Sequence, residues 1–222
     1  MTANTPKIFA DAALVIVDVQ NDFCPGGNLA VNGGDQVVPV INKLRNAFNT
    51  VVLTQDWHPA GHSSFASTHK AEPFTTKEMD YGTQVLWPDH CVQNSEGAEF
   101  RSDLTLSRGD GNWIIRKGTN PAIDSYSAFF ENDQKTRPTF NDGKTFTEKM
   151  KERGVKTLVF TGLAFDYCVG WNALDAVKEG FNAVVVEDAT RAIAPDTEAA
   201  MRKQLADAGV KVVKAVDLAK AF

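Results

Sequence analysis

The sequence contains few cysteines, and their arrangement excludes several kinds of protein. Only three occur in 222 residues, at Cys24, Cys91 and Cys168, far apart from one another. An odd number of distant cysteines is not a disulfide framework, and there is no Cys-x-x-Cys pair to indicate a redox motif or a zinc knuckle. We therefore expect a reduced, cytoplasmic protein whose thiols are free for chemistry.

Excess positive charge and long apolar runs are also missing. The net charge of −5 argues against a nucleic-acid partner, because phosphate binding requires a basic surface. The longest apolar runs, such as Ala12–Val17, are far too short to span a bilayer. The segment Met1–Asp11 is polar and lacks the basic-then-apolar pattern of a signal peptide. We therefore expect neither nucleic-acid binding nor membrane anchoring.

Short apolar runs alternate with segments of helical periodicity along most of the chain. The run from Ala13 to Val17 has no polar alternation, as expected of a strand buried on both faces of a parallel sheet. The pattern predicts a single α/β domain over residues 1–222, a three-layer doubly wound sheet of six parallel strands with helices on both faces. The expected strands lie near residues 13–19, 50–54, 113–115, 157–161, 183–186 and 211–214, and the expected helices near 37–48, 145–153, 168–179 and 195–208.

The alternation stops between about Gln55 and Gly111. This stretch holds all four histidines and two of the four tryptophans. A long irregular segment in a compact domain is usually functional or disordered, and the aromatic content here argues against disorder. We therefore expect a functional site in it. Two further polar, turn-rich segments, 107–112 and 132–143, have no functional interpretation.

Polar side chains follow four of the predicted strands. They are Asp18 after the first strand, Asp56 and His58 after the second, Lys117 after the third, and Cys168 after the turn that follows the fourth. Ligands of doubly wound sheets bind beyond the carboxyl ends of the strands. We therefore expect these side chains to share one edge of the sheet.

Taken singly, the candidates for chemistry have ordinary alternatives. Asp18 at the end of an apolar strand would have a raised pKa suited to proton transfer, yet a lone aspartate there is more often a loop hydrogen-bonding group. Lys117 would stabilise a thiolate or an oxyanion, or be a solvated charge. Cys168 at a helix N-terminus would have a lowered thiol pKa, or be a buried structural cysteine. Cys24 and Cys91, with no helix start after them, are expected to be packing residues.

Asp56 and His58 form an Asp-x-His sequence at the end of a strand. In an extended chain, residues i and i+2 project to the same side, so both side chains can reach one ion. His62, His69 and His90 are candidates to complete the set, although a lone histidine is more often a hydrogen-bonded surface or core residue. Two imidazoles and a carboxylate would leave an open site for a divalent ion, and zinc, iron and manganese all accept these ligands.

Six segments together resemble the nicotinamidase branch of the isochorismatase-like cysteine hydrolases. The segments are 14–23 (LVIVDVQNDF), 54–59 (TQDWHP), 87–91 (WPDHC), 116–118 (RKG), 124–129 (DSYSAF) and 162–169 (GLAFDYCV). They occur in family order and cover nearly the whole chain. The resemblance implies a six-stranded parallel sheet and an amidohydrolase that converts nicotinamide to nicotinate and ammonia, with pyrazinamide as a further substrate.

The resemblance also implies roles for individual residues. Cys168 would be the nucleophile, with Asp18 and Lys117 completing a triad. A cis peptide bond would precede Ala164, and the amides of Ala164 and Cys168 would form the oxyanion hole. The residues that resemble the lining of the family's pyridine pocket are Phe23, Trp87 and Tyr126, together with Ala164.

The implied cofactor is one divalent metal ion that holds the pyridine nitrogen. Its ligands would be Asp56, His58 and His90. Some relatives add a ligand from the loop after the Asp-x-His sequence, which makes His62 a candidate without a settled place.

Two alternatives stay open. A metal-independent sister hydrolase of another small amide or ether would keep the Asp, Lys and Cys arrangement. A dinucleotide-binding module or a non-catalytic scaffold would share the topology, but the first strand leads into Gln20–Gly27 rather than a Gly-x-Gly-x-x-Gly loop. The helical surfaces carry no heptad repeat that forces an interface, so a homo-oligomer is left open as well.

Overall fold

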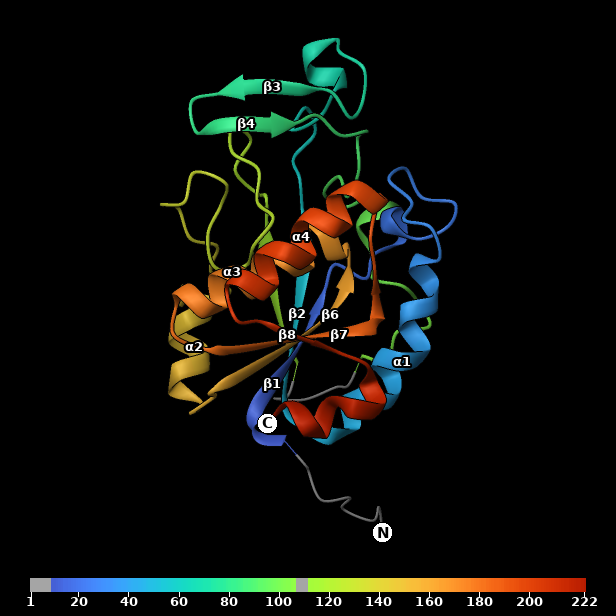
Figure 1. The fold of residues 1–222 in the computed structure, drawn as a ribbon. Coiled ribbons are helices and arrows are strands. Elements are labelled where there is room, and N and C mark those ends of the chain that lie inside the picture. Colours follow the sequence, from blue (N-terminus) through green and yellow to red (C-terminus); the bar gives the residue numbers. More distant parts are fainter. Residues whose placement is uncertain (1–8, 107–111) are drawn as a thin grey trace.

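The computed structural model describes residues 9–106 and 112–222, and its centre is a six-stranded sheet. The strand order is β5-β2-β1-β6-β7-β8, and every neighbouring pair is parallel (Figure 1). The expected six-stranded parallel sheet is therefore confirmed. Most of the N-terminal segment 1–11 and of the turn-rich segment 107–112 lies outside the described residues. The strands are β1 Phe9–Val17, β2 Phe48–Asp56, β5 Asn112–Lys117, β6 Thr157–Leu163, β7 Asn182–Arg191 and β8 Lys211–Val213.

Helices cover both faces of this sheet, because successive side chains of each strand point to opposite faces. Along β1, Leu14 and Ile16 belong to one hydrophobic core, while Val15 and Val17 belong to the other. The first core is closed by α1 and the second by α2, α3 and α4, which gives the three expected layers. The helices are α1 Val37–Leu44, α2 Phe146–Glu152, α3 Gly170–Lys178 and α4 Pro195–Asp207.

The helix expected over 37–48 is shorter than its periodicity indicates. It ends at Leu44, a 3₁₀ turn follows over Arg45–Ala47, and Phe48 already begins β2. The Phe48 side chain is buried against the ring of Phe9, with 5.0 Å between the centroids. An apolar residue at helical spacing therefore belongs to the same core without belonging to the helix.

An antiparallel hairpin was not predicted. Its strands are β3 Thr76–Met79 and β4 Gly82–Val85, and it lies beyond the carboxyl ends of the sheet strands (Figure 1). Most of its side chains are exposed, so the sequence there has no apolar alternation to reveal a strand.

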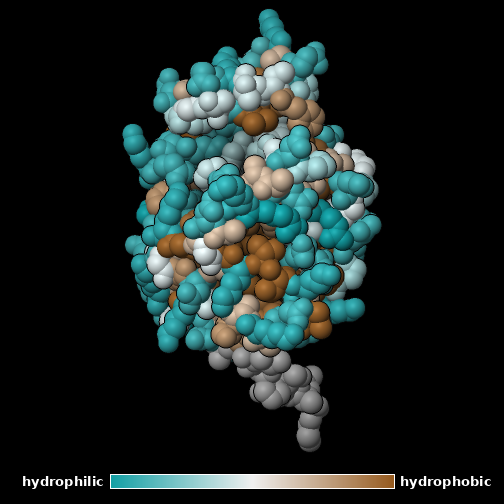
Figure 2. Space-filling model, viewed as in Figure 1, coloured by the Kyte–Doolittle hydropathy of each residue, from teal (hydrophilic) through white to brown (hydrophobic). Residues whose placement is uncertain are grey.

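The surface is mostly hydrophilic on the face drawn in Figure 2. Hydrophobic side chains gather near the middle of this face, in the part of the view where Figure 1 draws β7 and β8. Within residues 9–106 and 112–222, no helix has the length and apolar character needed to cross a membrane.

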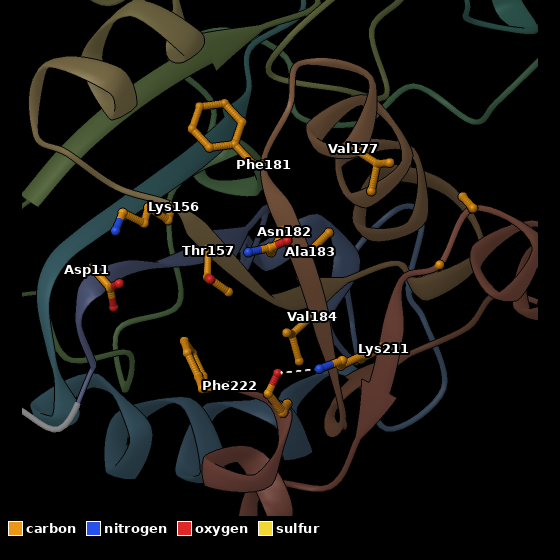
Figure 3. A pocket seen from close by; sticks show the side chains of 13 residues that line it. Asp11, Lys156, Thr157, Val177, Phe181, Asn182, Ala183, Val184, Lys211 and Phe222 are labelled. Atoms are coloured by element: carbon orange, nitrogen blue, oxygen red, sulfur yellow. Dashed lines mark hydrogen bonds between the residues drawn. The ribbon is translucent and has the colours of Figure 1, made fainter.

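A wide hollow of about 500 Å³ opens at the amino ends of the strands (Figure 3). Thr157, Asn182 and Lys211, the first residues of β6, β7 and β8, line it. Ligands of doubly wound sheets bind at the opposite, carboxyl edge. The hollow is therefore not the place where the sequence-predicted side chains meet.

Gly162 is required where β6 passes β1. Its φ is +106°, and an added Cβ would lie 2.0 Å from the carbonyl oxygen of Val17. We expect Gly162→Ala to lower the free energy of unfolding by about 3 kcal/mol, because the backbone must shift to admit the methyl group. Urea denaturation measures the loss.

Gly180→Ala is the matched control, because Gly180 also has a positive φ but nothing within 4 Å of the added Cβ. It should cost only the left-handed backbone penalty of about 1 kcal/mol. Equal losses in the two variants would contradict the steric explanation.

Candidate active site and metal centre

The parallel register brings three of the predicted side chains together. Asp18 directly follows β1, and Asp56 and Lys117 are Cα partners at the ends of β2 and β5. Asp18 has a φ of +46°, a strained left-handed conformation for a residue other than glycine, and Oγ of Thr54 donates to its Oδ1 at 2.5 Å. The expectation that the strand ends share one edge is therefore met.

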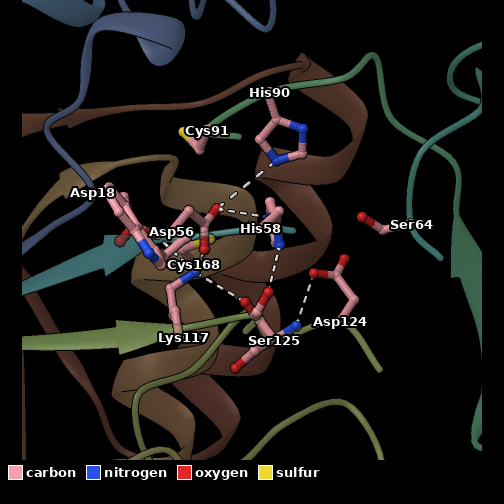
Figure 4. A network of polar contacts seen from close by, with 12 residues as sticks. Asp18, Asp56, His58, Ser64, His90, Cys91, Lys117, Asp124, Ser125 and Cys168 are labelled. Carbon is pink, nitrogen blue, oxygen red and sulfur yellow. Dashed lines mark hydrogen bonds and ion pairs between the residues drawn. The ribbon is translucent and has the colours of Figure 1, made fainter. Parts of the chain in front are cut away.

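Lys117 occupies the centre of this group with its side chain 0 % exposed (Figure 4). Its Nζ lies 2.9 Å from Oδ2 of Asp18, forms an ion pair with Oδ1 of Asp56, and lies 3.4 Å from Sγ of Cys168. It also donates to the carbonyl oxygen of Ser125 at 2.9 Å. Lys117 is therefore a buried, paired charge and not a solvated one.

Burial and charge shift the pKa values of these groups. Burial raises the pKa of Asp18 to about 6, although the Lys117 ammonium partly offsets the rise. Burial opposes the charge on Lys117, but the two carboxylates outweigh it and hold the pKa of Lys117 well above its ordinary value. At neutral pH the site therefore contains a carboxylate on Asp18 and an ammonium on Lys117.

Cys168 keeps its proton in this environment. Burial raises the pKa of its thiol well above the ordinary value, and the nearby ammonium of Lys117 lowers it only in part. The expectation that a helix N-terminus lowers the pKa of this thiol was therefore wrong. Desolvation and the carboxylates of Asp18 and Asp56 outweigh the Lys117 ammonium, so a thiolate has to form by proton transfer to a neighbouring base.

The turn that carries Cys168 also differs from the expected helix start. A π-helical turn covers Phe165–Val169 and leads into α3, so the helical stretch begins three residues before Cys168. The peptide bond before Ala164 is cis, as the resemblance implies. The amides of Tyr167 and Val169 both donate to the carbonyl oxygen of Ala164, at 3.1 and 3.0 Å. Single π-turns of this kind are frequent at functional sites.

Asn172 and Gly170 fix the position of this turn, the first by hydrogen bonds and the second by allowing close packing. The buried Asn172 donates from Nδ2 to the carbonyl oxygens of Cys168 at 2.8 Å and Tyr126 at 3.3 Å. An added Cβ at Gly170 would lie 2.4 Å from Sδ of Met201, so the glycine lets α4 approach closely. Cys168 thus sits in a turn that is fixed from both sides.

Asp56, His58 and His90 form a buried group whose ligand atoms all lie within 4.8 Å of one another. Nδ1 of His58 donates to the carbonyl oxygen of Gly118 at 2.9 Å, and Nδ1 of His90 donates to that of Pro88 at 2.8 Å. A carbonyl oxygen only accepts, so in the neutral imidazole of each histidine the proton is on Nδ1 and Nε2 carries a lone pair. These nitrogens lie 3.7 and 3.8 Å from Oδ2 of Asp56.

The group fits a divalent metal ion. Nε2 of His58 is buried without a hydrogen-bond partner, which is costly unless an ion binds there. Two imidazole nitrogens oriented by backbone carbonyls, together with one carboxylate oxygen, are a usual ligand set for such an ion. Gly118 is required beside it, because its φ is +62° and a Cβ would lie 2.3 Å from Cε1 of His58.

His62 and His69 are not members of this group, although a ligand atom of His62 lies within 4.8 Å of ligand atoms of His58 and Asp124. The ring of His62 packs 4.3 Å from that of His58, but its nitrogens bond to Oγ of Ser64 at 2.8 Å and to the carbonyl oxygen of Asn120 at 2.9 Å. Nε2 of His69 bonds to the carbonyl oxygen of Ser63 at 2.7 Å. The His62 ring therefore packs against His58, and neither of its nitrogens is free to bind an ion held by the group.

A narrow pocket runs between the thiol and the candidate metal-binding group Asp56, His58 and His90. All four residues expected from the resemblance line it: Phe23, Trp87, Tyr126 and Ala164. Cys168, Asp56 and His90 line it too, and the residues that the sequence interpretation missed are Leu29, Asp124, Tyr167 and Ile193. Tyr167 packs edge-on against Trp87 with 4.8 Å between the centroids. It directly precedes Cys168, which was a usable signal, whereas Leu29 and Ile193 come from distant loops and carried none.

A buried thiol beside a carboxylate and an ammonium, on a doubly wound sheet, is the arrangement expected of an α/β cysteine hydrolase. The chain belongs to the isochorismatase family, because residues 12–217 match the model of the isochorismatase domain. It is 50% identical to a nicotinamidase of Acinetobacter baylyi over 184 residues, 82% of each chain.

Solved structures agree with this assignment. A nicotinamidase/pyrazinamidase of Acinetobacter baumannii is 46% identical with a TM-score of 0.87, over 96% of this chain and 99% of that one. A pyrazinamidase of Pyrococcus horikoshii, solved in complex with zinc, is 33% identical with a TM-score of 0.71, over 92% of this chain and 99% of that one.

Because both histidines point Nε2 toward Asp56, we predict that they bind one divalent ion and that loss of either weakens this binding. Titration of metal-stripped protein with Zn²⁺ should show about one ion bound per chain. His90→Ala should weaken binding beyond the roughly 10–100-fold that loss of an outer-shell partner costs, because it removes a ligand. His69→Ala is the control and should bind as the wild type does, since its nitrogens face Ser63 and Lys77. Equal affinities of His90→Ala and the wild type would contradict the assignment.

Proposed function

We propose that this chain hydrolyses the carboxamide of nicotinamide to nicotinate and ammonia, and that it also accepts pyrazinamide. The observation that carries the proposal is one apolar pocket lined by the Cys168 thiol and by two members of the metal-ligating group, Asp56 and His90. A flat ring with a nitrogen on one side and a carboxamide on the other suits such a pocket. Relatives named nicotinamidase at up to 50% identity support the same substrate.

Asp18 is the general base in this scheme. Its pKa of about 6 leaves it as a carboxylate at neutral pH, near the value that suits proton exchange. It takes the proton of the Cys168 thiol while the sulfur attacks the carboxamide carbon and forms a tetrahedral intermediate. The same proton then passes to the nitrogen, the C–N bond breaks, and ammonia leaves a thioester on Cys168.

A water molecule completes the turnover. Asp18 takes a proton from the water while the water oxygen attacks the thioester carbon. The C–S bond then breaks, and Asp18 returns the proton to the sulfur. Lys117 stabilises the transient thiolate, since its Nζ lies 3.4 Å from Sγ. The amides of Ala164 and Cys168 are proposed to bind the oxyanion.

Asp56, His58 and His90 would hold the divalent ion, and zinc, iron and manganese all suit their chemistry. When bound, the ion supplies a Lewis acid that fixes the ring nitrogen and so orients the carboxamide toward Cys168. The zinc complex of the Pyrococcus horikoshii relative supports zinc as one candidate. Phe23, Trp87 and Tyr126 would enclose the ring and exclude water from it.

We also propose a cytoplasmic location and a single domain over residues 1–222. The three cysteines are buried and free, which suits a reducing compartment.

The direct test is ammonia release from a panel of amides. The wild type should hydrolyse nicotinamide and pyrazinamide, and should act poorly on benzamide, which lacks the ring nitrogen. Cys168→Ala should lose at least about 1,000-fold in kcat, because no nucleophile remains. Cys24→Ala alters a buried cysteine outside the pocket and should keep the activity. Full activity of Cys168→Ala would refute the thioester scheme.

A further inference from the structure

The hairpin β3–β4 has one buried side chain, and it is polar. Gln84 is 1 % exposed, whereas the other residues of the two strands are exposed or half-buried. A buried amide in an otherwise solvated hairpin needs hydrogen-bond partners inside the protein. Two of those partners, Asp124 and Tyr126, line the pocket.

The two ends of the Gln84 amide bond to different groups. Nε2 donates to the carbonyl oxygen of Val85 at 2.7 Å and to Oδ2 of Asp124 at 2.8 Å, and it lies 3.1 Å from Oη of Tyr126. Oε1 accepts from Nδ2 of Asn132 at 3.1 Å and from Oη of Tyr81 at 3.2 Å. Since a carbonyl oxygen only accepts, the amide nitrogen must be the atom that faces Val85 and, with it, Asp124. The amide therefore has one satisfactory orientation.

These hydrogen bonds connect Gln84 to residues that line the pocket and, through Ser125, to the buried ammonium of Lys117. Asp124 and Tyr126 line the pocket, while Gln84 does not. Oδ1 of Asp124 accepts from the amide of Ser125 at 2.8 Å, and the carbonyl oxygen of Ser125 accepts from Nζ of Lys117 at 2.9 Å. Gln84 thus connects the hairpin by hydrogen bonds to one segment of the chain. That segment carries Tyr126, which lines the pocket, and Ser125, whose carbonyl oxygen accepts from Lys117.

We propose that Gln84 is a positioning residue for ring binding, which holds the Tyr126 phenol and the Asp124 carboxylate at the pocket wall. The hairpin β3–β4 is then the outer support of that wall. Gln84 touches no reacting atom, so it acts on substrate affinity through its two partners. This inference rests on the proposed hydrolysis of nicotinamide.

Gln84→Leu tests the role by removing the side-chain hydrogen bonds while filling a similar volume. KM for nicotinamide should rise about tenfold, the size of one lost bond to a charged group, while kcat stays within about twofold. A side chain that only stabilised the fold would lower the unfolding temperature and leave KM unchanged. Steady-state kinetics and thermal unfolding of the same samples separate these outcomes.

Gln84→Glu gives a second readout that a purely structural role would not move. The titratable groups that face position 84 are Asp124, Tyr126 and Tyr81. At about pH 8 two carboxylates would repel each other, whereas a protonated glutamic acid at about pH 6 can donate to Asp124 as the amide does. The ratio of the variant's KM to that of the wild type should therefore be large at about pH 8 and fall toward one at about pH 6.

Thr83→Ala is the matched control, because Thr83 is the exposed neighbour on β4 and its hydroxyl donates to Glu78. It should leave KM unchanged. A KM ratio of Gln84→Glu that is flat from about pH 6 to 8, or an unaltered KM in folded Gln84→Leu, overturns the proposal. If Gln84→Leu does not fold, the pH dependence of Gln84→Glu decides.

Failure of the proposed function is recognised separately, because the wild type would then release no ammonia from nicotinamide. In that case the dissociation constant of nicotinate, followed by tryptophan fluorescence, replaces KM in the same comparison. Wild-type affinity in both Gln84 variants would overturn the positioning role there too.

Discussion

The structure of the site depends on one buried ammonium group. Lys117 is fully enclosed, and an ion of this kind costs several kcal/mol to desolvate unless its partners compensate. Asp18 and Asp56 provide that compensation from the ends of two neighbouring strands, and Ser125 adds a carbonyl oxygen. Two carboxylates and one ammonium leave a net negative charge beside the thiol. That remaining charge favours a cation at the histidines and opposes a resting thiolate on Cys168.

Asp56 links the two halves of the site. Its Oδ1 pairs with Lys117, while its Oδ2 faces Nε2 of His58 and of His90. The register of β2 against β5 creates this arrangement, because it sets Asp56 and Lys117 opposite each other at the strand ends. A change in charge on the metal-binding side therefore acts on the groups around Cys168 through a single carboxylate.

Much of this site could be predicted from the sequence, for physical reasons. The ends of parallel strands meet at one edge, so Asp18, Asp56 and Lys117 could be placed together from apolar runs alone. The protonation state of Cys168 could not be predicted in this way, because it depends on how deeply the folded chain buries the thiol. Leu29 and Ile193 were missed because they reach the pocket from loops that are distant in sequence, and only the folded chain brings these loops together. The hairpin was missed because its strands carry no apolar pattern, and the substrate came from the resemblance and not from residue spacing.

The proposed role of Asp18 as the base for Cys168 is tested most sharply by the pH dependence of kcat/KM for nicotinamide. Burial raises the pKa of Asp18 to about 6, and a base acts only when deprotonated. We expect kcat/KM to fall about tenfold per pH unit below about pH 6, and Asp18→Asn to be inactive across the range. A flat profile from about pH 5 to 8, or an active Asp18→Asn enzyme, would contradict it.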